Sequence, residues 1–165
     1  FQLIGSSCVV SATVVSAMHF VLASIVFQEN KMSVLTDIGT YLNDASISTQ
    51  DLTLGTNLFL GRLPETPDTC VGVIQTAGVA PTDTFGTSFP PLETQGLQTL
   101  VRATTYATAE ALAVDIMKSL ASVDNQTLTS TLYLKIEAQQ SPFALERDNQ
   151  ERLVMSCNFL VTKTL

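Results

Sequence analysis

The side chains that most often carry out catalysis are scarce in this sequence of 165 residues, which contains one histidine and three cysteines. A Ser–His–Asp or Cys–His arrangement needs an imidazole to accept the proton of the nucleophile. The histidine, His19, lies in an apolar stretch near the start of the chain, where we expect a tolerated residue rather than a base. The sequence therefore argues against catalysis that uses a histidine as a general base.

The cysteines, Cys8, Cys70 and Cys157, lack the spacing of metal ligands and cannot complete a zinc site with one histidine. Cys70 and Cys157 fall in apolar, strand-like segments, where a buried and reduced thiol is the usual state. A disulfide between them would require their strands to be neighbours. The segment from Gly55 to Gly61 lacks the Lys–Ser/Thr ending of a phosphate-binding loop. We predict no metal and no cofactor.

Charged residues gather in one polar connection near the C-terminus, where Arg147, Asp148 and Arg152 stand beside Glu146 and Glu151. A cation site or an acid–base pair is one interpretation of this group. The mixed signs favour a solvated loop whose charges neutralise one another. If the group binds anything, its alternating signs suit an ion-pair network at an interface better than a metal.

Arg102 stands among apolar residues of a predicted strand. A charged side chain in such a place must be paired or lie at a sheet edge. We expect a structural role for Arg102, with an ion pair between subunits as the alternative.

The overall composition describes an acidic chain with enough apolar residues for a core. Hydrophobic residues make up 45% and charged residues 14%, and the net charge is −7. Domains that grip nucleic acid phosphates carry clustered Lys and Arg, so this balance argues against that function.

The first 31 residues differ from the rest, because no charged residue occurs from Phe1 to Gln28. Cys8–Phe27 is apolar and long enough to cross a bilayer as a helix, but no basic residue flanks it on the N-terminal side. Residues 1–31 are thus an apolar extension of doubtful role: an upstream extension, a membrane or signal segment, or a buried element. Residues 32–165 are expected to form a single domain.

Two helices are predicted in that domain. Ser33 can cap the first, whose apolar residues Leu35, Ile38 and Leu42 recur at helical spacing. The second spans Tyr106–Val123 and carries one apolar stripe. Period-2 alternation and turn residues predict five strands, separated in one place by a long loop over Gly78–Leu92. The predicted strands are 56–64, Cys70–Ala77, Gly96–Thr104, Thr131–Gln139 and Leu153–Thr162.

The element order is therefore α-β-β-β-α-β-β. Only one step, the crossover through the second helix, could join parallel strands. We predict an α+β fold: a mostly antiparallel or mixed sheet of about five strands with two helices packed on one face.

Three stretches from residue 54 to residue 163 carry a likeness to a known family. The first runs through a Pro–Asp turn into an apolar strand (LGTNLFLGRLPETPDTCVGVIQTAGVAP). The second joins a strand containing Gln98 and Arg102 to a helix that starts with Tyr106 and Ala109. The third is a closing hairpin with Pro142, Asp148, Arg152, Asn158 and Phe159. In this order the blocks resemble the tail-terminator proteins of long-tailed bacteriophages, often labelled minor capsid or tail-completion proteins.

The resemblance implies a structural virion protein without enzymatic activity, assembled in the host cytoplasm. By this resemblance we expect a homo-oligomeric, hexameric ring on the head-proximal end of the tail tube. The ring stops polymerisation of the tube and offers a surface to the head-completion protein. The acidic balance of this chain would let DNA pass through the channel without specific binding.

A closed ring needs head-to-tail contacts. We expect them in two loops, Gly78–Leu92 and Ser141–Arg152, with phenylalanines as anchors unless these fold back onto their own domain. The predicted interface residues are Phe85, Phe89, Arg102, Phe143, Arg147, Asp148 and Arg152.

Three alternative interpretations of the function stay open. The chain could be a membrane-anchored accessory protein, with residues 1–28 as the span and a soluble head. It could be a small enzyme that uses carboxylates alone, although no spaced acidic pair predicts one. It could also be a head-completion or tail-tube protein of the same particle.

Overall fold

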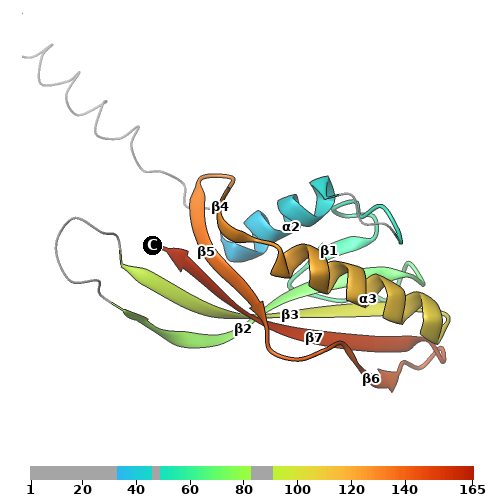
Figure 1. The fold of residues 1–165 in the computed structure, drawn as a ribbon. Helices are drawn as coiled ribbons and strands as arrows, with labels where there is room; N and C mark the ends of the chain where they lie inside the picture. The colour runs from blue at the N-terminus through green and yellow to red at the C-terminus, as the bar shows by residue number, and fades with distance from the viewer. Residues whose placement is uncertain (1–32, 46–48, 83–90) are drawn as a thin grey trace, which may run out of the picture. The chain divides into compact units, whose positions relative to one another are not determined.

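The computed structural model describes residues 33–45, 49–82 and 91–165. Within these ranges seven strands form one curled, mixed sheet, and two helices pack on one of its faces (Figure 1). The predicted fold class is confirmed. The apolar extension, residues 1–31, lies outside the described residues.

Both helices begin at a hydroxyl side chain that caps a free backbone N–H. Ser33 accepts from Thr36 at the start of α2 (Val34–Asp44), and Thr105 accepts from Thr108 at the start of α3 (Tyr106–Ala121). The predicted stripe of α3 faces the sheet. Its buried members are Ala109, Leu112, Ala113, Ile116 and Leu120.

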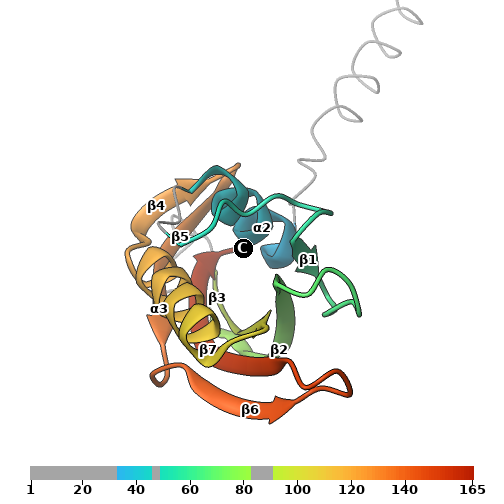
Figure 2. The ribbon, with the colours of Figure 1, turned by 90° about the vertical axis from the view of Figure 1, so that its right-hand side faces the viewer.

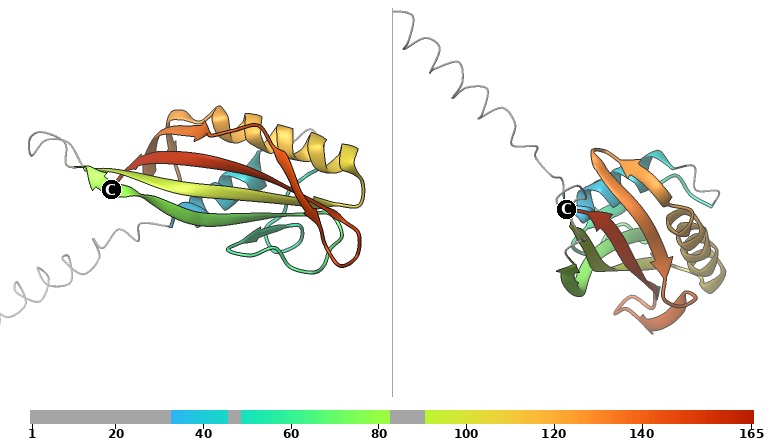
Figure 3. Two further views of the ribbon diagram at one scale, coloured as in Figure 1. Left: turned by 90° about the horizontal axis from the view of Figure 1, so that it is seen from below. Right: turned by 60° about the vertical axis from the view of Figure 1, so that its left-hand side comes forward.

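The sheet runs in the order β1-β2-β3-β7-β5-β4, and β6 pairs with the first part of β7. β1 is parallel to β2, and every other pair is antiparallel. The long strands β2, β3 and β7 lie side by side at the centre, as the view from below shows (Figure 3). The strand bounds are β1 Leu58–Leu60, β2 Cys70–Thr82, β3 Leu92–Ala103, β4 Asp124–Leu128, β5 Thr131–Ala138, β6 Phe143–Arg147 and β7 Leu153–Thr164.

The two helices cover different parts of the same sheet face. α3 packs on β3, β5 and β7, whereas α2 contacts β1 and β2 and also β4 at the opposite end of the strand order. Figure 2 shows how the sheet curls, so that β1 and β4, the two ends of the strand order, both lie near α2. The Tyr41 hydroxyl of α2 donates to the Ser119 carbonyl of α3 at 3.1 Å, which joins the helices across the core.

Three sequence predictions need correction. Gly78–Thr82 was expected to belong to a loop but continues β2, and β3 begins at Leu92 rather than Gly96. β4 and β6 were not predicted at all. All five residues of β6 and four of the five in β4 are exposed, so neither strand has the apolar alternation that identifies a half-buried strand.

The expected state of two cysteines is confirmed. Cys70 and Cys157 are both buried and free, and burial raises the pKa of each thiol. Their strands, β2 and β7, are separated by β3, so they are not neighbours.

Candidate functional site

Two buried arginines lie side by side where β3 ends and β7 begins. The strand register sets Arg102 opposite Val154, and side chains two residues apart on a strand share a face. Arg152 therefore emerges on the same face as Arg102, diagonally across the strand pair. Their exposed fractions are 4% for Arg102 and 5% for Arg152, so each guanidinium must find partners inside the chain.

The first set of partners is the loop between β1 and β2. Nη2 of Arg102 donates to the carbonyl oxygens of Glu65 at 2.9 Å and Pro67 at 2.5 Å. Nη1 of Arg152 donates to the Glu65 carbonyl and to the Asp68 carboxylate, both at 2.8 Å. The two arginines thus hold the loop of residues 65–68, which contains a cis peptide bond before Pro67. The loop supplies acceptors mainly through its backbone.

The second partner is Asp148, in the turn after β6. Its Oδ2 accepts from Arg152 at 2.7 Å and lies 3.8 Å from Nη1 of Arg102. Its Oδ1 accepts the backbone N–H groups of Gln150 at 2.9 Å and Arg152 at 3.0 Å. The hydrogen bond from the Arg152 side chain, followed by those backbone donors, lowers the pKa of Asp148 to about 2. We call Arg102, Arg152, Asp148 and Asp68 the ion cluster.

The ion cluster borders an open cavity of about 310 Å³ between the loop of residues 63–65 and the turn of residues 148–150. Gln150 reaches across this cavity and donates to the Glu65 carboxylate at 3.1 Å. Both backbone segments around the cavity are therefore held by side-chain bonds, which gives this end of the domain a defined shape.

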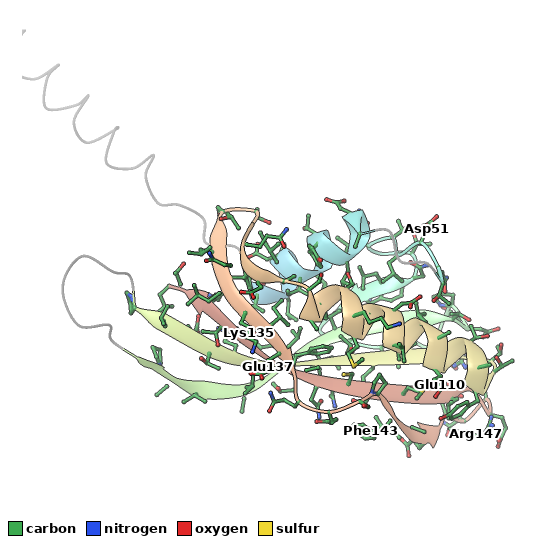
Figure 4. The ribbon with its side chains drawn as sticks, viewed as in Figure 1. Asp51, Glu110, Lys135, Glu137, Phe143 and Arg147 are labelled. Atoms are coloured by element: carbon green, nitrogen blue, oxygen red, sulfur yellow. The ribbon has the colours of Figure 1, made fainter. Side chains whose placement is uncertain are left out.

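β6 lies next to the ion cluster and presents a row of side chains to solvent. A register shift between Ala144 and Glu146 interrupts the alternation of β6, so Phe143, opposite Ser156, and Arg147, opposite Leu153, lie on opposite faces of the sheet. Phe143 and Leu145 are 39% and 47% exposed. Figure 4 shows Phe143 and Arg147 along the outer part of the sheet, beyond β7 and away from α3. Within the described residues, no strand pairs with the outer edge of β6.

A second exposed strand edge belongs to β2. β1 covers the outer edge of β2 only as far as Val73, and no described strand pairs with that edge from Ile74 to Thr82. Residues 75–81 are all exposed, and Val79 is 63% exposed. We call Ile74–Thr82, together with its partner segment Leu92–Gln98 of β3, the arm.

Cross-strand bonds brace the arm on its inner side. Lys163 of β7 pairs with Glu93 at 2.9 Å, and Gln75 donates to Gln95 at 2.9 Å. A side chain at Gly78 would put its Cβ 2.4 Å from the carbonyl oxygen of Thr94, so the two strands approach closely only because this residue is glycine. The arm is a braced strand pair up to Thr82 and Leu92.

The structure brings together most of the residues predicted for an interface. Arg102, Asp148 and Arg152 meet in the ion cluster, and Phe143 and Arg147 lie beside it on β6. The expectation that Arg102 is paired is confirmed, with partners from its own chain. Phe85 and Phe89 lie outside the described residues.

Sequence reasoning missed Asp68, Leu145 and Val79. Asp68 closes the acidic, Pro-rich segment LPETPD, whose composition predicts only a turn. Leu145 and Phe143 are the two large apolar residues of an otherwise polar connection, which indicates a surface contact but not a strand. Val79 stands between small residues, and no signal in the sequence distinguishes it from a loop residue.

In residues 33–45, 49–82 and 91–165, no group of three or more His, Cys, Asp or Glu side chains is arranged to hold a metal ion. No helix in the same ranges is long and apolar enough to cross a membrane.

Comparison with known proteins gives two findings. A family model described as "Bacteriophage tail terminator protein" matches residues 41–165. A chain from a structure entitled "Virion of native gene transfer agent (GTA) particle" has a similar fold, with a TM-score of 0.57 and 13% sequence identity. The match covers 81% of this chain and 96% of that chain. No curated protein matches the sequence.

Proposed function

The chain belongs to the bacteriophage tail terminator family, and on that premise we propose that its copies close into a hexameric ring at the head-proximal end of the tail tube. Membership makes the chain a structural component of the virion that assembles with other phage proteins. The ring stops growth of the tube and joins it to the head-completion protein. The chain has this structural role and no enzymatic one.

The observation that best supports a ring is the presence of two separate unpaired strand edges. The outer edge of β6 and the arm lie toward opposite ends of the long strands (Figure 1). A contact between β6 of one copy and the arm of the next joins two different surfaces. Such head-to-tail contacts repeat, and they close into a ring when the rotation per copy is suitable. Unpaired edges are also the usual template for pairing with another chain.

The predicted interface residues take two roles in this proposal. Phe143 and Arg147 on β6 contact the neighbouring copy directly, because they are exposed. Arg102, Asp148 and Arg152 act through other residues: they hold the loop of residues 65–68 and the turn after β6 in the shape that the neighbour meets. Phe85 and Phe89, which lie outside the described residues, remain proposed contacts.

The proposal includes a central channel through which DNA passes, and the net charge of −7 supports this. A ring on a tail tube surrounds the path of the genome, and an acidic lining repels phosphates. DNA therefore passes through the channel without specific binding.

Native mass spectrometry of the purified full chain, with negative-stain images of the same sample, tests the ring. The proposal predicts one closed species of about six copies. A series of open polymers without a preferred length would favour a tail-tube subunit instead. A discrete dimer would contradict the head-to-tail contact, because a two-fold interface joins the same surface of both copies.

A further inference from the structure

A second cavity, of about 160 Å³, lies between α2 and the turn that joins β4 to β5. Its walls combine acidic, hydroxyl and apolar side chains. Asp37, Thr40, Tyr41 and Asp44 come from α2, and Leu128 and Thr129 come from the β4 side. Asp37, Thr40 and Asp44 follow one another at spacings of three and four residues, which sets them on one helix face.

Asp37 is the unusual member of this group, because its carboxylate is buried with half of its acceptors unused. The residue is 1% exposed. Its Oδ2 accepts from the Tyr133 hydroxyl at 2.7 Å, and this contact and burial raise the pKa of Tyr133, burial being the larger cause. Its Oδ1 is the buried side-chain oxygen in the described residues that has no hydrogen-bond partner. A buried carboxylate normally has its oxygens paired, so a donor is expected from elsewhere.

The surroundings favour a positive donor. Residues 33–61 contain Asp37, Asp44 and Asp51 but no Lys or Arg, and residues 122–130 contain Asp124 and again no basic residue. None of the cavity's lining residues is basic. A cationic group arriving from another molecule would meet only negative charge on these segments.

We propose that this cavity receives an arginine side chain from an adjoining subunit of the particle. Leu128 and the Tyr41 ring offer apolar surface to the aliphatic stem, and a guanidinium over an aromatic ring gains further attraction. The guanidinium donates to Asp44 and to the Thr40 and Thr129 hydroxyls, and it reaches Asp37 Oδ1, which is covered in the unbound chain, when the Asp37 side chain turns toward the cavity. The inference rests on the proposed function in one respect, since a neighbouring subunit must deliver the side chain.

A guanidinium suits the spacing of the carboxylates better than a metal ion does. Asp37 and Asp44 are seven residues apart on α2, which separates their backbones by about 10 Å along the helix axis. A calcium ion needs its ligand oxygens within about 2.3–2.6 Å, so it could bind one of the two carboxylates directly but not both. Arginine has five N–H donors spread over a planar group and reaches acceptors that lie further apart.

The test is an NMR titration of the full chain with N-acetyl-arginine-N-methylamide at constant ionic strength, observing the backbone amides of Leu128 and Thr129. We expect saturable shifts in the millimolar range. The Asp37→Asn variant keeps an acceptor for Tyr133 and should weaken binding at least tenfold. Asp44→Asn, at an exposed position, should weaken it as well and serves if the first variant does not fold. Asp124→Asn removes the same charge outside the cavity and should leave binding unchanged.

Three results would overturn the inference: absence of saturation, equal binding by all three variants, or saturation of the same amides by CaCl₂ but not by the arginine probe. The titration does not require a ring. Absent binding in a chain that forms rings contradicts this inference alone, whereas binding by a chain that forms no ring contradicts the proposed function alone.

Discussion

Arg102 and Arg152 place two buried cations beside one another, and their repulsion is offset by acceptors from two separate segments. Asp148 supplies a carboxylate to both, and the loop of residues 65–68 supplies carbonyl oxygens and Asp68. These acceptors lie more than 30 residues from Arg102 along the chain. The ion cluster therefore links the end of β3, the start of β7 and the loop before β2.

Replacing Arg102 should destabilise the fold. Arg102→Met keeps the length of the stem but removes the Arg102 hydrogen bond to the Pro67 carbonyl and one of the two arginine hydrogen bonds to the Glu65 carbonyl. We expect the free energy of unfolding to fall by about 2–4 kcal/mol, because hydrogen bonds from a buried charged group are lost. Urea unfolding measures this, with Arg62→Met as the exposed control, expected within about 0.5 kcal/mol of the unchanged protein. Equal effects of the two substitutions would contradict the structural role of Arg102.

The ion cluster should also make stability depend on acid. The pKa of Asp148 is lowered from 3.8 to about 2, chiefly by the Arg152 hydrogen bond, so folding favours the charged carboxylate. That contribution is complete above about pH 4 and is lost as the pH falls through about 2. The Asp148→Asn variant has no carboxylate at this position and therefore lacks this pH-dependent contribution to stability. The stability difference between the two proteins, measured by urea unfolding, should therefore shrink between about pH 5 and pH 2. A constant difference over this range would refute the assignment.

Arg102 illustrates how far a single residue can be understood from sequence. A charged side chain among apolar strand residues is expected to be paired, and Arg102 pairs with Asp148. Its partners could not be named, because most are backbone carbonyls of a distant turn, and a turn sequence says nothing about which strand it covers. Asp37 shows the same limit: its helix position was evident, but its burial depends on β4 and Tyr133.

Among the elements, the arm and β6 present the unpaired strand edges that we propose as contacts, in addition to the outer edges of β1 and β4 at the two ends of the strand order. Substitution of an exposed edge residue should change assembly without changing the fold. Val79→Lys and Leu145→Lys each put a charge on one proposed contact, at positions that are 63% and 47% exposed. We expect each to change the free energy of unfolding by about 0.5 kcal/mol or less and to abolish the ring.

Sedimentation velocity together with urea unfolding separates these two effects. Leu54→Lys, which changes another exposed apolar residue at a different surface, is the control and should retain the ring. Rings that survive both test substitutions would exclude the arm and β6 as the contacts.

Helices and strands with one buried face could be predicted from the sequence, whereas strands without a buried face could not. The α3 stripe and the alternation of β5 come from contact with the core, so their periods are visible. β4 and β6 are almost entirely exposed, and Gly78–Thr82 contains Gly and Pro, which are typical of loops. Their strand conformation is imposed by pairing with β5, β7 and β3, a tertiary effect that no local pattern records.

For the whole molecule, curvature and charge are the features that relate to a ring. The sheet curls so that α2 contacts both ends of the strand order, which leaves the arm and β6 free to face outward. The chain carries a net charge of −7, so a ring of several copies accumulates a strong negative field. Ring formation should therefore be favoured by moderate salt, which screens repulsion between exposed charges.

Electron microscopy of tail tubes assembled with and without the full chain tests whether this protein terminates the tail. We expect tubes assembled with the chain to carry one ring at a single end and to stop growing at that end. Tubes assembled without it should continue to lengthen. Tubes that grow equally in both samples, with no ring at either end, would contradict the claim that this protein terminates the tail.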